Sequence, residues 1–179
     1  SVVDEIEWVG KKFGVKDFLF WSESFTINHQ FAQSVAQEII RRRLKVSWVC
    51  NSRVDTVDYP LLKKFAQAGC WMIGYGIESG EQKVLDMMEK GTTLKQAKRA
   101  VQDAHRAGLE VTGHCVIGYP GETRKTTQQT IEFAKNLDLD FVQFYCAVPF
   151  PGSDLFDLAK KENWITSEDW GFFEQNFSV

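Results

Sequence analysis

The sequence has only four cysteines, and no two of them lie close enough together to form a compact metal site. Cys50, Cys70, Cys115 and Cys146 follow one another at long intervals, so no CxxC or CxxxC spacing occurs. Zinc knuckles and iron–sulfur loops depend on such spacings. Because no secretory signal precedes them, a disulfide framework is not expected either. We therefore interpret all four cysteines as free structural thiols.

The sequence also lacks an excess of positive charge and a long apolar run. A formal net charge of -3 and a pI near 5.7 give no electrostatic footprint for nucleic acid. No apolar stretch approaches the roughly 20 residues of a membrane span, and the N-terminus has no signal-peptide pattern. We therefore expect a cytoplasmic protein without a membrane or nucleic-acid partner.

Hydrophobic periodicity predicts a regular alternation of helices and strands along the chain. Short, nearly continuous apolar runs are typical of buried parallel strands, and stripes at helical spacing separate them. Strands are expected at 18–21, 46–50, 71–77, 111–117 and 141–146, and helices at 1–14, 28–43, 58–69, 81–88, 93–107, 123–137 and 153–162. In the helix from Asn28, Phe31, Val35, Ile39 and Ile40 form the expected inner stripe.

This alternation predicts right-handed βαβ units and one parallel sheet. A doubly wound open sheet and a barrel both satisfy the pattern. No GxGxxG or Walker loop follows the first strand, which disfavours the nucleotide-binding fold. We divide the chain into one α/β unit at 1–164 and an aromatic C-terminal extension at 165–179.

Each expected strand ends in polar or glycine-rich residues, and in parallel α/β folds these ends carry the chemistry. Each cluster also has a structural explanation. Glu78–Ser79 and Glu122–Thr123 can cap helices, Pro-Gly pairs mark turns, and Arg53 can pair with Asp55 on the surface. The five clusters follow the strands in order: Ser22–Thr26, Asn51–Asp55, Glu78–Gly80, Gly118–Thr123 and Val148–Ser153.

The order of these motifs resembles the radical S-adenosylmethionine (SAM) superfamily. The motifs are SESFTIN, WVCNSRVD with DYPLLKKFAQAGC, GIESGEQKVLDMMEKGTT, VIGYPGET and VPFPGSDLF, spanning about Val3 to Trp164. They are most like the branch with cobalamin-binding enzymes and methylthiotransferases. The resemblance implies a partial TIM-like (β/α) barrel, here with parallel strands 2 to 6 and without the first strand and its cluster loop.

The resemblance also implies a SAM site at the strand ends. Ser22 and Glu23 match the segment that meets the methionine amino group, where many relatives have two acids, so Glu23 is the only candidate carboxylate. A charge-assisted bond from an ammonium suits this task. Arg53 is expected to pair with the SAM carboxylate, and Glu78 with Ser79 to contact the ribose and carboxylate.

The adenine contacts are expected from the last two strands. His114, Val116 and Gly118 match the family pattern GxIxGxxE, but His114 replaces its first glycine and Glu122 falls one place late. Val148 and Pro149 are expected to border adenine through their backbone. A lone histidine beside a buried strand is also typical of a hydrogen-bonded core group, which is the structural alternative for His114.

Radical SAM chemistry needs a [4Fe–4S] cluster on three cysteines, and this sequence contains no such motif. We expect the motif directly upstream of Ser1, and therefore no activity from this chain alone. The parent enzyme is expected to cleave SAM to a 5′-deoxyadenosyl radical, with methyl or methylthio transfer as the outcome, a reductant such as a flavodoxin or ferredoxin, and a possible cobalamin domain upstream. A degenerate, non-catalytic scaffold is the alternative. An aldolase-like TIM barrel would need a lysine or metal triad at the strand ends, which the five clusters lack.

Overall fold

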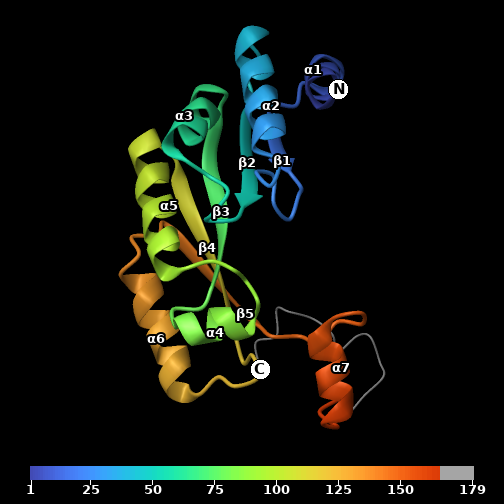
Figure 1. Cartoon of the computed structure of the whole chain (residues 1–179). Helices are drawn as coiled ribbons and strands as arrows, with labels where there is room; N and C mark the ends of the chain where they lie inside the picture. Colours follow the sequence, from blue (N-terminus) through green and yellow to red (C-terminus); the bar gives the residue numbers. More distant parts are fainter. Residues whose placement is uncertain (166–179) are drawn as a thin grey trace.

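The computed structural model describes residues 1–165 as an α/β unit built on one parallel sheet (Figure 1). Its strands pair side by side in the order β1-β2-β3-β4-β5. They are β1 (Asp17–Phe20), β2 (Ser47–Ser52), β3 (Cys70–Glu78), β4 (Glu110–Ile117) and β5 (Phe141–Cys146). The helices are α1 (Val2–Phe13), α2 (His29–Arg41), α3 (Tyr59–Gln67), α4 (Gln82–Met87), α5 (Leu94–Ala107), α6 (Arg124–Lys135) and α7 (Asp154–Lys161).

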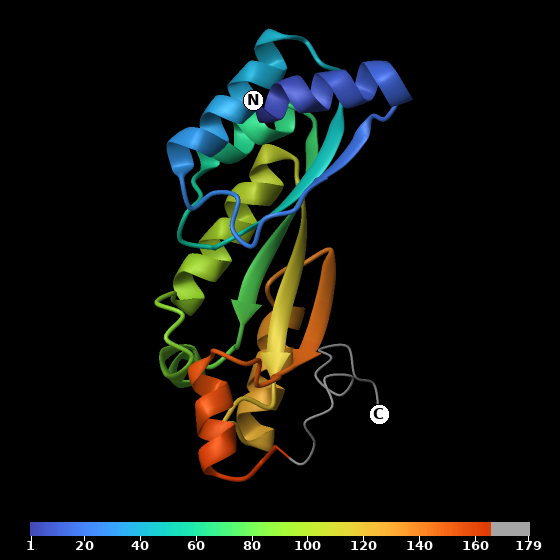
Figure 2. The same ribbon diagram turned by 90° about the vertical axis from the view of Figure 1, so that its right-hand side faces the viewer.

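The strand order decides between the two folds that the sequence allows. A doubly wound sheet reverses its strand order at a switch point, whereas each strand here pairs with the next one in sequence. Helices α2, α3, α5 and α6 consequently lie along the same face of the sheet (Figure 2). This is the geometry of an open segment of a (β/α) barrel, and it confirms the predicted fold.

Side-chain caps in the sequence set where the helices begin. Ser1 and Thr93 form capping boxes with Asp4 and Gln96, and Asp58 accepts from the amide of Leu61. These oxygens satisfy amides that have no partner inside the helix. The observed bounds therefore differ from the expected ones by only a few residues.

The helix-covered face of the sheet forms the core. Trp48, Phe65 and Tyr75 are almost fully enclosed, and Phe20 stacks on Trp48 with ring centroids 4.5 Å apart. Burial follows the strand alternation: Ile73, Tyr75 and Ile77 of β3 pack against the helices, so Gly74 and Gly76 lie on the opposite, inner face. At positions 74 and 76 the central strand therefore contributes no side chain to the inner face, and side chains from neighbouring segments occupy the space above it.

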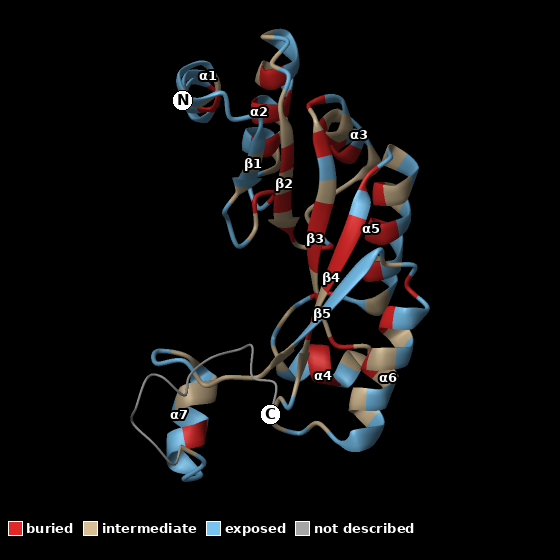
Figure 3. Ribbon diagram, turned by 180° about the vertical axis from the view of Figure 1, so that it is seen from behind, coloured by how far each residue is buried: buried red, intermediate tan, exposed pale blue. Residues whose placement is uncertain are grey.

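The two edges of the sheet are more exposed than its middle, as the pale blue β5 shows (Figure 3). The predicted stripe of α2 is wrong in part, because Val35 and Ile39 are buried while Phe31 and Ile40 are exposed. No strand lies beyond β1 to cover Phe31 within residues 1–165.

Among residues 1–165, none of the helices has the length and apolar character that crossing a membrane requires. All but the first residue of the predicted extension at 165–179 lies outside the described residues.

Candidate functional site

Parallel pairing brings the carboxyl ends of all five strands to the same end of the sheet. The first segment there is the stretch Trp21–Ser24, which we call the arch. Trp21 is 87% exposed, and Ser22 and Glu23 are exposed beside it. The Glu23 carboxylate makes no hydrogen bond or ion pair within residues 1–165. Its position is therefore set by the backbone on either side of it.

Both ends of the arch are fixed in the core. Before it, Phe20 stacks on Trp48; after it, Phe25 packs in the same aromatic group, and its amide donates to the Asn51 carbonyl at 3.0 Å. Thr26 follows and is completely buried. The arch thus carries the Glu23 carboxylate on a base whose two ends are packed in the core.

An ion-pair group occupies the ends of β2 and β3. The Arg53 guanidinium donates to both carboxylate oxygens of Asp55 at 2.9 Å and to the Lys90 carbonyl at 2.9 Å. This contact holds the pKa of the Asp55 carboxyl below its usual value. The structural alternative for Arg53, pairing with Asp55, is thus confirmed. Two of the guanidinium nitrogens, Nε and Nη2, therefore already donate to acceptors within the chain.

Glu78 ends β3 in a strained conformation. Its φ is +60°, in the left-handed region that residues other than glycine rarely adopt, and the Ser79 amide donates to the Ile77 carbonyl at 2.8 Å across it. The pairing register between β3 and β4 shifts at the same point. Backbone strain of this kind concentrates at functional sites because the surrounding structure has to hold it.

The strained turn places the Glu78 carboxylate over the inner face. Lys90, from the loop between α4 and α5, donates to Glu78 Oε1 at 2.6 Å, and both side chains are largely buried. A Cβ added at Gly76 would lie 2.6 Å from this Glu78 oxygen and 3.0 Å from Lys90 Nζ. Because Gly76 has no Cβ, the Glu78 carboxylate and the Lys90 ammonium have room to lie together over the strand.

His114 lies on the inner face beside this pair. Its Nδ1 is 3.2 Å from the Tyr145 hydroxyl, which in turn donates to Gln143 Oε1 at 2.5 Å. Its Nε2 is buried without a hydrogen-bond partner among residues 1–165, and burial lowers the pKa of the imidazole. The ring is thus part of a polar chain between β4 and β5, as the structural alternative expected.

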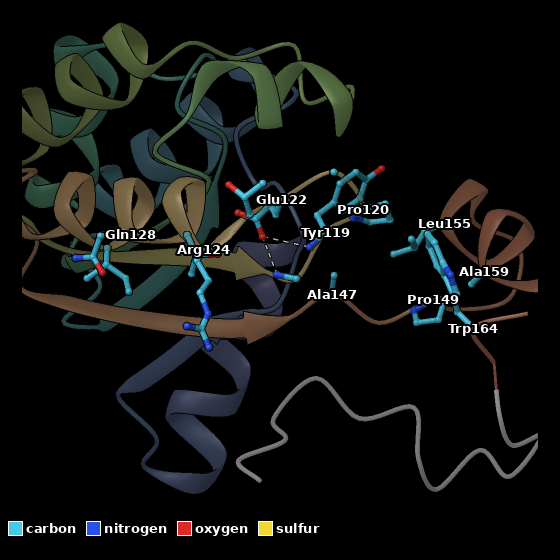
Figure 4. A pocket seen from close by; sticks show the side chains of 15 residues that line it. Tyr119, Pro120, Glu122, Arg124, Gln128, Ala147, Pro149, Leu155, Ala159 and Trp164 are labelled. Carbon is cyan, nitrogen blue, oxygen red and sulfur yellow. Dashed lines mark hydrogen bonds between the residues drawn. The ribbon is translucent and has the colours of Figure 1, made fainter. Parts of the chain in front are cut away.

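The loop between β4 and α6 is held closed by Glu122. Its Oε2 accepts the amides of Gly118 at 2.7 Å and Tyr119 at 3.2 Å, as the dashed lines in Figure 4 show. Gly118 has a φ of +82°, which explains why glycine stands there. Glu122, one place late against the family pattern, thus stabilises the loop through its side chain.

A cavity of about 880 Å³ lies between this loop, α6 and α7, with Pro149 on its far side (Figure 4). Two of the predicted adenine contacts, Gly118 and Pro149, line it, whereas His114, Val116 and Val148 do not. The cavity is lined by Gly118, Tyr119, Pro120, Gly121, Glu122, Thr123, Arg124, Thr127, Gln128, Ile131, Ala147, Pro149, Leu155, Ala159 and Trp164.

The structure brings most of the predicted residues to one end of the sheet. Arg53 and Glu78 join through Lys90, and Val116 shares the inner face with His114 by strand alternation. Ser79 differs: its hydroxyl is 0% exposed and lies 3.1 Å from that of Thr130 in α6. A ligand could reach the Ser79 side chain only after a rearrangement, so its predicted role stays a prediction.

Sequence reasoning missed Lys90. A lysine was expected only among the residues that directly follow a strand, and Lys90 comes twelve positions after Glu78. The signal that could have found it is Gly91, the residue after Lys90, which has a φ of +66° and marks a turn in the loop between α4 and α5.

The residues present suit SAM but not the cluster. No group of three histidine, cysteine or acidic side chains within residues 1–165 could hold a metal, and Cys50, Cys70 and Cys115 are buried in the core. For SAM, the donor set includes a free carboxylate on the arch, two cations at Arg53 and Lys90, and a glycine-lined space between opposite charges. These groups match an ammonium, a carboxylate and neutral hydroxyls.

Fold and site together define an open (β/α) barrel segment with a charged, glycine-lined mouth. The chain belongs to the radical SAM superfamily, whose family model matches residues 1–134. It is 35% identical over 169 residues to an uncharacterised methyltransferase of Pyrococcus horikoshii, covering 94% of this chain and 37% of that protein. It is 34% identical over 175 residues to the anaerobic magnesium-protoporphyrin IX monomethyl ester cyclase of Rubrivivax gelatinosus, covering 96% and 32%.

The fold is shared with a solved cobalamin-containing enzyme. The radical SAM methyltransferase TsrM from Kitasatospora setae, with cobalamin and a [4Fe–4S] cluster bound, superposes with a TM-score of 0.82 at 23% identity, covering 89% of this chain and 31% of that one. This chain spans about a third of the length of the curated relatives named above.

Proposed function

We propose that this chain is the SAM-binding barrel of an enzyme that cleaves SAM reductively and carries out methyl or methylthio transfer. One observation carries the proposal: Glu78 and Lys90 face each other 2.6 Å apart over the bare backbone of Gly76, at the carboxyl end of the central strand. We choose SAM as the ligand because the chain belongs to the radical SAM superfamily.

The proposal assigns a role to each charged group. The Glu23 carboxylate accepts hydrogen bonds from the methionine ammonium, and Lys90 with Arg53 receives the methionine carboxylate. Glu78 then turns from Lys90 to the ribose hydroxyls. Charge-assisted hydrogen bonds of this kind contribute about 1.5–3 kcal/mol each. The cavity between Gly118 and Pro149 takes the adenine.

The remaining partners of the proposed reaction lie outside these residues. When bound, a [4Fe–4S] cluster supplies the electron for SAM cleavage, and a flavodoxin or ferredoxin is the proposed reductant. Cobalamin is included as a methyl carrier because the solved relative TsrM contains it. We also propose that the enzyme is located in the cytoplasm.

The test uses the whole protein, purified without oxygen and with its cluster reconstituted. Dithionite and SAM are added, and 5′-deoxyadenosine and S-adenosylhomocysteine are measured. We expect SAM cleavage by the wild type, and a rise of about tenfold to hundredfold in the KM for SAM in Lys90→Met. The matched control Lys83→Met, on the exposed side of α4, should leave the KM unchanged. Absence of SAM cleavage by the wild type would contradict the proposal.

A further inference from the structure

A buried cluster of three hydroxyl groups lies directly behind the arch. The Thr26 hydroxyl bonds the Ser52 hydroxyl and lies 2.5 Å from that of Thr56. The Arg53 carbonyl oxygen lies 3.2 Å from the Ser52 hydroxyl and 3.1 Å from the Thr56 hydroxyl, so either hydroxyl can donate to it. Thr26 and Ser52 are 0% and 3% exposed, so water does not compete for the bond between them, whereas Thr56 is partly buried.

The three hydroxyl protons can point in one direction around this cluster. Thr56 then donates to Thr26, Thr26 to Ser52, and Ser52 to the Arg53 carbonyl. Thr26 and Ser52 then each both donate and accept, and such a chain is strengthened by mutual polarisation. Thr26 is the only member on the arch side, and without its hydroxyl the chain is cut in the middle.

The cluster joins the segments that carry the proposed methionine-binding charges. Thr26 comes three residues after Glu23, Ser52 precedes Arg53, and Thr56 follows Asp55. Because the Glu23 carboxylate has no partner of its own within residues 1–165, its distance from Arg53 depends on how the base of the arch is fixed. On its C-terminal side the base is also held by the backbone bond from the Phe25 amide to the Asn51 carbonyl, and on its N-terminal side by the pairing of Phe20 with Cys50 in the β1–β2 ladder.

We propose that Thr26 is a positioning residue: its buried hydroxyl fixes the arch relative to Arg53, so that Glu23 and the cations hold the two ends of one methionine group. This inference rests on the proposed function. It assigns no ligand contact to Thr26 itself. The proposed role depends on the hydroxyl group, which a valine of the same shape lacks and a serine retains.

The test compares Thr26→Val with Thr26→Ser in the reconstituted holoenzyme. The valine keeps the volume and removes the hydroxyl, while the serine keeps the hydroxyl. We expect a rise of about tenfold or more in the Kd for SAM, measured by anaerobic calorimetry, in the valine variant, and a change within about twofold in the serine variant. Hydrogen exchange of the Phe25 amide without SAM should also quicken by about tenfold in the valine variant.

Two further variants separate positioning from general destabilisation. Val101→Ala, in the buried stripe of α5, matches the loss of stability away from the strand ends and should leave the Kd for SAM within about twofold. In a Glu23→Gln background, Thr26→Val should have little further effect, because it acts through Glu23.

Each failure has a separate meaning. If Thr26→Val leaves the Kd for SAM unchanged, if Val101→Ala weakens SAM equally, or if the effects of Thr26→Val and Glu23→Gln simply add, the role of Thr26 is wrong. If the wild-type holoenzyme binds no SAM, the proposed function fails instead.

Discussion

Because the backbone at Glu78 is strained, we predict that a glycine at this position is more stable than an alanine. Glu78→Ala and Glu78→Gly both remove the carboxylate and leave Lys90 equally unpaired, so their difference isolates the backbone. A left-handed conformation costs alanine about 1–2 kcal/mol and glycine nothing. Glycine loses about 0.5–1 kcal/mol more entropy on folding. With a φ of +60° at this position, Glu78→Gly should therefore be the more stable variant by about 0.5–1 kcal/mol.

Urea unfolding measures this difference. With a slope of about 2 kcal/mol per molar urea, the midpoint of Glu78→Gly should lie about 0.3–0.5 M above that of Glu78→Ala. Val116 provides the control, because it lies in the neighbouring strand without a positive φ. There the order should reverse, with alanine more stable than glycine. An alanine variant at position 78 as stable as the glycine variant would refute the assignment of strain.

Three further predictions concern other parts of the unit. Gly80→Ala should lower the free energy of unfolding by about 1–3 kcal/mol in urea, because its Cβ would lie 2.5 Å from Phe133 Cβ and 2.6 Å from a backbone oxygen of α6; an unchanged midpoint would contradict this packing. Burial raises the pKa of the Cys115 thiol to about 12, so iodoacetamide at pH 8 should label it only after unfolding, and native labelling detected by mass spectrometry would count against the burial. Burial lowers the pKa of His114 despite the facing Glu78 carboxylate, so the unfolded chain binds this proton more readily and stability should fall as the pH drops below about 6.5; His114→Gln should flatten this part of the pH profile of the urea midpoint, and an unchanged slope would argue against it.

The fold could be predicted because local signals and tertiary structure agree. Asn28 and Asp58 cap the helices at the expected places, and apolar runs become buried strands. The exposed Phe31 could not be predicted, because periodicity reports that a helix has an apolar stripe and not whether another element covers it. The choice between a barrel segment and a doubly wound sheet also required the strand order, which no single element encodes.

The candidate site was predictable only in outline. Parallel strands guarantee that their carboxyl ends meet, so Arg53 and Glu78 were expected near each other. The side-chain directions depend on long-range packing: Ser79 bonds Thr130, fifty-one positions away, and Lys90 returns to Glu78 from a later loop. A residue's place after a strand therefore predicts which end of the sheet it occupies, but not which neighbour its side chain contacts.

The charges at the mouth add a physical argument for the proposed ligand. Glu23, Asp55 and Glu78 contribute three negative charges and Arg53 and Lys90 two positive ones, which leaves one negative charge in excess. SAM carries an ammonium, a carboxylate and a sulfonium, and thus one positive charge in excess. Both cations are paired within the chain, Arg53 with Asp55 and Lys90 with Glu78. On this proposal a bound methionine carboxylate exchanges partners with an existing carboxylate instead of compensating a lone cation, and the SAM ammonium supplies the partner that the Glu23 carboxylate lacks within residues 1–165.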